Sequence, residues 1–259
     1  MTIRKRFPMI VGMALFSMLV SLASAQMPEQ AAREKAQSIV RSQLDYLRPG
    51  QFLSVQRDEG LERLLAVTAG GLTGVEFIYQ VSPAGDEIKE HAVVHHLVTD
   101  GDPVYLVAVN PANGSTHRIA GFRDSKAELN KLLAALGIKL SSEDQVEELA
   151  DFYRAVNPEH RSMARISGLL QLKQAAEHQC QAVPFDPSEK DFEVWWKHAR
   201  TTYANVSFKQ TATRSDGGYA VEWIVLSSPG AGLCGGAPLH ARLEVRSDGS
   251  IDEISFRPL

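Results

Sequence analysis

The strongest constraint on the fold is a change of hydrophobic period within residues 103–158. Residues 104–110 are an apolar run of strand-forming residues, residues 110–114 have the composition of a turn, and residues 115–122 predict a returning strand. Apolar side chains then recur every three or four residues, which predicts two amphipathic helices in sequence. The block therefore predicts an antiparallel strand pair followed by a helix pair.

Both predicted helices have recognisable ends. Ser125 and Glu128 predict a capping box at the start of the first helix, and Gly137 predicts its end. Ser142 and Gln145 predict a cap on the second helix. The two apolar stripes, which we expect to lie in the core, are Leu129, Leu132, Leu133 and Leu136, and Val146, Leu149, Ala150, Tyr153 and Val156.

The segment before this block predicts one helix and several strands. Residues 28–47 carry a helical apolar stripe, and residues 51–56 predict a strand. Residues 61–68 are compatible with either a strand or a helix. Residues 75–81 alternate between apolar and polar side chains, which predicts a strand, and residues 91–98 predict the next one.

The segment after the block predicts two helices and a meander. Residues 160–181 predict a helix. A second, aromatic-faced helix is indicated by the helical spacing of Phe192, Trp195, Trp196, Ala199 and Tyr203. Glycine-containing turns separate four predicted strands, at residues 206–213, 219–225, 239–245 and 251–256.

Both halves therefore combine helices with an antiparallel sheet, which predicts the α+β class with units at residues 26–140 and 141–259. The order of a helix followed by a meander resembles the layout of cystatin-like and NTF2-like α+β rolls. This resemblance is one of architecture and implies no function.

The first 25 residues predict a secretory signal peptide. Arg4, Lys5 and Arg6 form a basic start, residues 9–20 are uncharged and mostly apolar, and residues 23–25 (Ala-Ser-Ala) predict cleavage before Gln26. The alternative is an uncleaved membrane anchor, but the apolar run is short for a membrane span. We therefore expect a periplasmic or secreted protein of bacterial type, with no membrane insertion after cleavage.

The charge of the mature chain limits its partners. Removal of the three basic residues of the signal changes the formal net charge from −4 to −7. This argues against nucleic acid and against an anionic membrane surface as general partners. A small molecule or a protein remains the expected partner, and no motif indicates a cofactor.

The two cysteines predict one disulfide bond. Cys180 and Cys234 are the only thiols in the chain, and export places them in an oxidising compartment. Cys234 lies in the glycine-rich loop 227–238, which joins two predicted strands. The alternative reading is a nucleophile–base pair of Cys234 and His240, but a disulfide would block it.

Histidines are the other candidates for chemistry. His91 and His95 point to one face of their predicted strand and His96 to the other, with the first two about 13 Å apart in an extended strand. That separation is too large for one metal ion, so a metal would need further ligands such as His117. We therefore expect no bound metal.

The sequence shows no complete catalytic constellation. Trp195 and Trp196 are compatible with stacking on a ligand, but core packing against the last sheet is the stronger expectation. We therefore expect an exported, non-catalytic α+β protein that binds a ligand or a protein. The alternatives are a secreted hydrolase that uses histidines of the first sheet with an acidic residue, and an inhibitor-like module that presents the loop 227–238.

Overall fold

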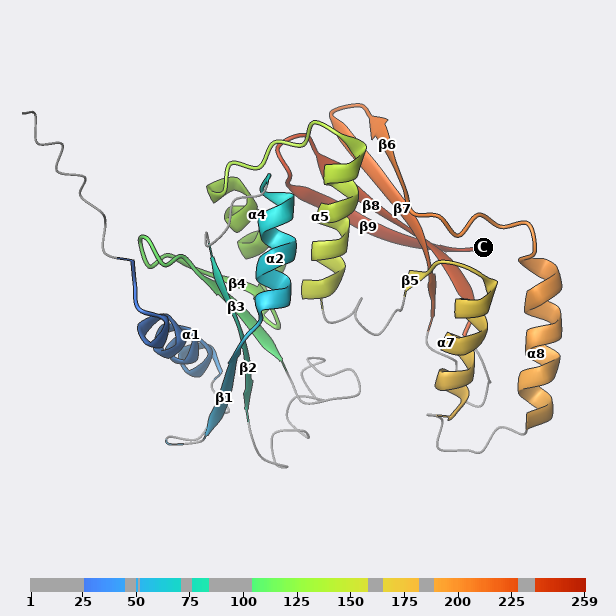
Figure 1. Ribbon diagram of the computed structural model, residues 1–259, viewed down its shortest axis with the longest axis horizontal. Helices are drawn as coiled ribbons and strands as arrows, with labels where there is room; N and C mark the ends of the chain where they lie inside the picture. The colour runs from blue at the N-terminus through green and yellow to red at the C-terminus, as the bar shows by residue number, and fades with distance from the viewer. Residues whose placement is uncertain are drawn as a thin grey trace, which may run out of the picture.

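The structure is a computed structural model that describes residues 26–44, 50, 52–70, 76–83, 104–157, 165–181, 189–227 and 236–259 (Figure 1). The predicted signal peptide and the predicted strand 91–98 lie outside these residues. Within them, helices combine with two antiparallel sheets, so the predicted α+β class is confirmed.

The first sheet is a meander covered by helices on both faces. Its four strands are antiparallel and lie in the order β1-β2-β3-β4. Their bounds are Leu53–Arg57, Phe77–Pro83, Tyr105–Val109 and Thr116–Ala120. Helix α1 (Glu29–Gln43) packs its predicted stripe of Ala32, Ala36 and Val40 against one face. Because helices also cover the other face, β3 is buried along its whole length.

Two helices, α2 (Glu59–Thr68) and α4 (Ser125–Ala135), cover that other face, and α5 (Glu143–Val156) packs against α2. Residues 61–68, for which the sequence left a strand or a helix open, are helical. Asp58 accepts a hydrogen bond from the Leu61 backbone nitrogen at 2.9 Å and so caps the helix. Leu61 and Leu65, one turn apart, are then both buried in the core.

The second sheet lies beyond α5. Its order is β5-β7-β8-β9, and β6 pairs with the start of β7. The bounds are Arg165–Ile166, Thr211–Ser215, Gly218–Leu226, Pro238–Arg246 and Ile251–Pro258. The predicted meander of four strands is present as β6 to β9, and β5 adds a fifth strand that the sequence did not indicate. The side chains that face the shared core are those predicted by alternation, including Tyr219, Val221, Trp223, Val225, Ala241, Leu243 and Val245.

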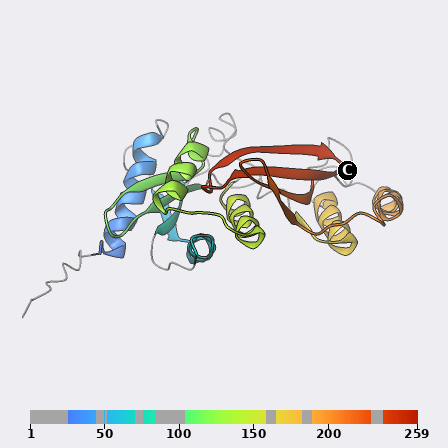
Figure 2. The same cartoon turned by 90° about the horizontal axis from the view of Figure 1, so that it is seen from above.

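One hydrophobic core joins the two sheets. Figures 1 and 2 show α2 and α5 side by side between the sheets, and a single buried cluster contains residues of both. The Asn130 side chain of α4 also exchanges two hydrogen bonds with the backbone of Ile251 in β9, at 3.0 and 2.9 Å. The hydrophobic core therefore extends across residue 140, where the sequence predicts the boundary between two units.

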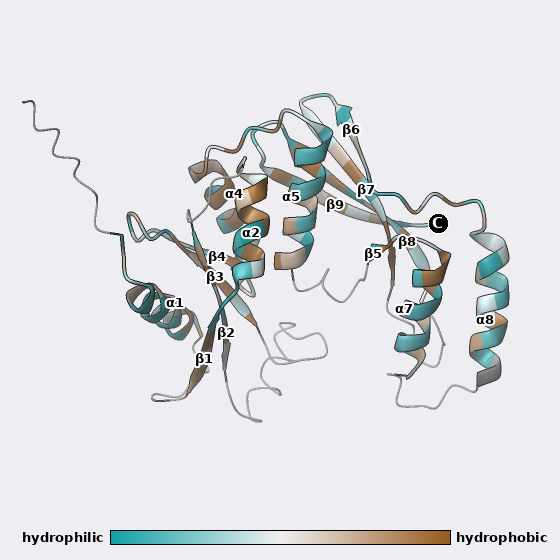
Figure 3. Cartoon of the chain, viewed as in Figure 1, coloured by the Kyte–Doolittle hydropathy of each residue, from teal (hydrophilic) through white to brown (hydrophobic). Residues whose placement is uncertain are grey.

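Helices α7 (Leu169–Gln181) and α8 (Glu189–Thr202) lie on the opposite side of the second sheet. Ile224 and Leu226 alternate onto that face of β7 and join a third cluster with Leu172 and Ala176 of α7. In Figures 1 and 2, α8 is the helix farthest from α1, with α7 between it and the strands. Figure 3 shows α8 alternating between hydrophilic and hydrophobic colours, as expected for a helix with one face on the core.

Three local predictions are wrong. Residues 165–166 are not helical, because their backbone pairs with Val225 and Ile224 of β7, and α7 begins only at Leu169. The capping box of α4 does not form. Asp124 is the residue before the helix, and the Ser125 hydroxyl bonds to the backbone of Phe122 instead. The strand predicted at residues 206–213 begins only at Thr211.

Other predicted ends are confirmed. Gly137 has a positive φ of 63° just after α4, a conformation that glycine adopts without strain. The Ser142 hydroxyl accepts from the Gln145 backbone nitrogen at 3.3 Å, and the Gln145 side chain accepts from the Ser141 backbone nitrogen at 2.9 Å. Local sequence therefore specifies the ends of this helix pair, apart from the start of α4.

Candidate functional site

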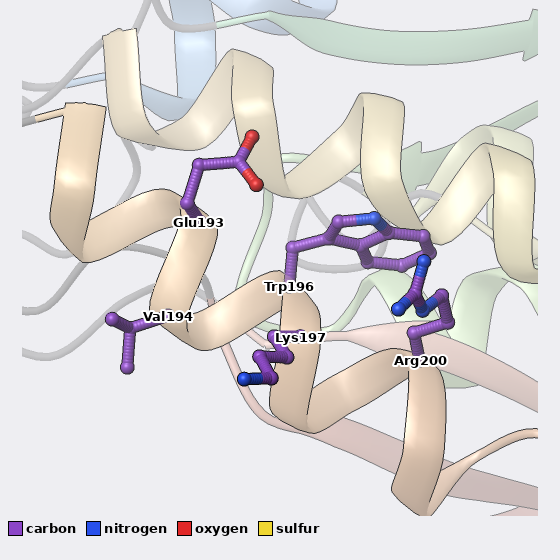
Figure 4. A pocket seen from close by; sticks show the side chains of 5 residues that line it. All are labelled: Glu193, Val194, Trp196, Lys197 and Arg200. Atoms are coloured by element: carbon purple, nitrogen blue, oxygen red, sulfur yellow. The ribbon is translucent and has the colours of Figure 1, made fainter.

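A surface pocket lies along helix α8. It has a volume of about 300 Å³ and is lined by Glu193, Val194, Trp196, Lys197 and Arg200. Glu193, Trp196 and Arg200 are three or four residues apart and follow one another along one side of the helix (Figure 4). We call these five residues, together with Lys173 of α7, the α8 face.

The inner side of α8 explains why this face points outward. Phe192 and Ala199 are buried, and Phe192 belongs to the cluster beneath α7. The ring of Trp195 stacks on that of Phe192, with centroids 6.0 Å apart, and lies 6.4 Å from the ring of Trp196. The two tryptophans are therefore half-buried at the rim of the cluster, and only Trp196 lines the pocket. Core packing therefore explains the position of the Trp195 side chain, whereas the Trp196 side chain also lines the pocket.

The α8 face is apolar at its centre and mostly cationic around it. The Nζ atom of Lys173 lies 5.9 Å from the ring centroid of Trp196, within the range of a cation–π interaction. Lys197 and Arg200 are exposed, and Val194 is 71% exposed. Glu193 is the one acidic side chain among the lining residues. This arrangement suits a ligand that carries an apolar group and negative charge.

His117, a candidate from the sequence, lies beside an acidic residue. Its Nδ1 atom is 3.8 Å from a carboxylate oxygen of Glu128, and both side chains are largely buried. Burial lowers the pKa of His117, although the charge of Glu128 opposes this effect. Burial raises the pKa of Glu128, but the hydrogen bond and charge of Lys131 outweigh burial and hold that pKa below its usual value. At neutral pH, these two shifts favour a neutral imidazole beside an ionised carboxylate.

The remaining histidines of the hydrolase hypothesis cannot be joined to this pair. His91, His95 and His96 lie outside the described residues. In the part of the chain that the structure describes, no three histidine, cysteine or acidic side chains are grouped as metal ligands would be. The described helices likewise include none that is long and apolar enough to cross a membrane.

The predicted disulfide also involves a residue outside the described part. Cys180 is 6% exposed within the cluster beneath α7, whereas Cys234 is not described. The structure does describe the two ends of the loop that contains Cys234. The Gln179 side chain donates to the Ser227 carbonyl and accepts from the Gly236 backbone nitrogen, both at 3.2 Å. The last turn of α7 thus holds the two ends of the loop together.

Glu76 is a buried acid that the sequence pattern did not reveal. Alternation placed it on a polar face of its strand, yet it is only 5% exposed, because helices cover both faces of the first sheet. Burial raises its pKa to about 7, although a hydrogen bond from Asn110 at 2.9 Å favours the ionised form. The available signal was the neighbouring strand β3, whose side chains are apolar on both faces, because such a strand is buried on both sides.

Comparison of the chain with known protein families, with curated proteins and with solved structures finds no match.

Proposed function

We propose that the mature chain is an exported, non-catalytic binding protein whose α8 face engages a protein segment with acidic and apolar side chains. The observation that carries this proposal is Trp196, which is half-buried beside a pocket and flanked by Lys173, Lys197 and Arg200. Tryptophan offers a large apolar surface with few rotatable bonds, and such residues often dominate binding energy.

The charge pattern favours an acidic partner. The mature chain as a whole carries a formal charge of −7, so three cations around one aromatic ring stand out locally. Cations at the rim of an apolar contact speed association with an oppositely charged partner and align it. Acidic groups of the partner would meet Lys197 and Arg200 while an apolar side chain covers Trp196.

Export is part of the same proposal. Cleavage of the signal peptide before Gln26 would release the mature chain into the periplasm or outside the cell. We also retain the cystatin-like or NTF2-like layout, supported by α1 packing across a four-stranded meander. N-terminal sequencing of exported protein checks the cleavage, and mature protein that begins at Met1 would contradict it.

The proposed binding can be measured with synthetic peptides. The probe is a labelled peptide of alternating aspartate and leucine, compared with one in which lysine replaces aspartate, followed by fluorescence anisotropy. We expect the acidic peptide to bind more tightly, with an affinity that falls as salt rises. Trp196→Ala should weaken binding by about tenfold or more, because it removes the aromatic contact.

Charge reversal supplies the matched control. Lys197→Glu and Arg200→Glu should each weaken binding of the acidic peptide, whereas Lys139→Glu changes an exposed cation away from α8 and should leave it unaltered. Equal losses in all three variants would show a general electrostatic effect and overturn the proposal. If binding depends on Lys197 and Arg200 alone, native mass spectrometry of protein from its own host would identify the natural partner.

A secreted hydrolase is the second candidate, supported by His117, whose Nδ1 atom lies 3.8 Å from a carboxylate oxygen of Glu128. A neutral imidazole beside a carboxylate is an arrangement that general-base catalysis uses. The test is hydrolysis of p-nitrophenyl acetate by the mature protein and by its His117→Ala variant. A rate that does not depend on His117 would remove this candidate.

A further inference from the structure

A second polar cluster lies between α5 and the second sheet, separate from the α8 face. Its centre is the Asp151 carboxylate of α5, which accepts a hydrogen bond from an Nη atom of Arg154. The same carboxylate lies 3.8 Å from an Nη atom of Arg165 in β5 and 3.4 Å from the side-chain nitrogen of Gln210. We call these residues, with Trp223 of β7, the Asp151 cluster.

Many polar atoms of this cluster lack a hydrogen-bond partner. Among the described residues, six buried side-chain nitrogen or oxygen atoms are unpartnered, and four of them belong to the Asp151 cluster. They are Arg154 Nη1, Arg165 Nε, Trp223 Nε1 and Gln210 Oε1. Gln210 is 1% exposed and Trp223 is also 1% exposed, so bulk water does not reach them freely. Native proteins rarely leave such atoms unsatisfied, because a buried polar atom without a partner loses the hydrogen bonds that it makes with water in the unfolded chain.

The chemistry of the unpartnered atoms indicates what is missing. Three of the four are donors, and two of those belong to guanidinium groups. Two guanidinium groups share one carboxylate, so the cluster has an excess of one positive charge. Burial lowers the pKa of Arg154, and the positive charge of Arg165 adds to this effect, although Asp151 opposes it. The cluster therefore lacks an acceptor that carries negative charge.

Packing holds Arg154 in place and leaves Arg165 and Asp151 partly exposed to solvent. The guanidinium carbon of Arg154 lies 5.3 Å from the ring centroid of Trp223, which fixes that side chain over the indole. The Arg154 side chain is only 14% exposed, whereas those of Arg165 and Asp151 are 35% and 38% exposed. The cluster is therefore in contact with solvent at Arg165 and Asp151.

We propose that the Asp151 cluster is a binding site for an oxyanion, held by the free donors of Arg154 and Arg165 with the Trp223 indole nitrogen. Planar guanidinium groups match the oxygens of carboxylates and phosphates, and such charge-assisted hydrogen bonds are stronger than neutral ones. The ligand is a phosphate group or a carboxylate of a small molecule. This site is independent of the α8 face and of any peptide bound there.

The test uses the full mature chain with sodium phosphate, sodium acetate or sodium chloride at equal ionic strength. We expect saturable heat in isothermal titration calorimetry and a higher melting temperature with phosphate or acetate, but not with chloride. Binding of phosphate alone would identify a phosphoryl ligand, and binding of acetate would identify a carboxylate. No saturable binding of either anion would overturn the proposal.

Two further measurements connect binding to the named residues. Arg165→Gln should weaken anion binding by about tenfold or more, whereas Arg214→Gln on the exposed part of β6 should not. In the unmodified protein, the indole N–H resonance of Trp223, identified by its loss in Trp223→Phe, should shift during the titration. An unshifted Trp223 resonance, or equal loss in both arginine variants, would show binding elsewhere on the surface.

Discussion

At the scale of single residues, burial changes the chemistry of Glu76. The residue lies just before β2, where Asn110 donates to one carboxylate oxygen, and the other oxygen has no partner among the described residues. An ionised carboxylate is poorly solvated in such a position, so its pKa rises to about 7. Glu76 is therefore protonated in the folded chain at pH values where it would be ionised in the unfolded chain.

This difference predicts a pH dependence of stability. Because the folded-state pKa of Glu76 is raised, its contribution is fully present below about pH 4.5 and is lost as pH rises to about 7. The total loss is on the order of 3 kcal/mol. Glu76→Gln should remove this dependence and make the protein more stable than the wild type at pH 8. Urea unfolding at several pH values measures the effect.

The control for Glu76 is an exposed acid. Glu59→Gln makes the same chemical change at the exposed start of α2 and should leave the pH profile unaltered. A Glu76→Gln variant that retains the wild-type profile between pH 5 and pH 8 would show that another group is responsible.

At the scale of elements, each helix contributes an apolar stripe to the core. Leu133 in α4 is fully buried, as its helical spacing predicts. Leu133→Ala should destabilise the protein by about 2–5 kcal/mol, because it removes buried methyl groups and leaves a cavity. Denaturant unfolding measures this loss, and Val67→Ala, at a residue 47% exposed in α2, is the control. A loss under about 1 kcal/mol at Leu133 would mean that the site collapses without a cavity.

Helix α7 should also be bonded covalently to the loop between β7 and β8. Gln179 holds the ends of that loop next to Cys180, which favours the predicted disulfide between Cys180 and Cys234. The bond would close a segment of about 55 residues, for which the chain-entropy model gives roughly 4 kcal/mol. Non-reducing peptide mapping should find the two cysteines linked, and reduction should lower the melting temperature. Two free thiols in exported protein would disprove the bond and make Cys234 with His240 a candidate reactive pair.

At the scale of the whole molecule, the two sheets share one core. Leu65 and Ile78 from the first part of the chain belong to the same buried cluster as Leu149 and Trp223 from the second. Because neither sheet can expose this surface without cost, we expect the mature chain to unfold in one cooperative transition. Circular dichroism and tryptophan fluorescence should report the same midpoint. Two separate midpoints would show that units 26–140 and 141–259 unfold independently.

The candidate sites were less predictable than the elements. The helical spacing of α8 was evident, but how much of Trp196 is covered depends on how α7 packs against α8. Arg154 and Arg165 lie on different elements, and only the pairing of β5 with β7 places them around one carboxylate. No pattern within a short stretch of sequence predicts that two distant residues lie close together in space.

The sequence by itself determined the local structure of most elements. Alternation along residues 219–225 specified a strand, and Gly137 and Ser142 specified helix ends, because these signals act through neighbouring backbone bonds and local conformational preferences. Only the tertiary structure decided that residues 61–68 are a helix, that Arg165–Ile166 form a strand and that Glu76 is buried. These outcomes depend on which distant surfaces cover a segment, and the free energy of that burial exceeds weak local preference.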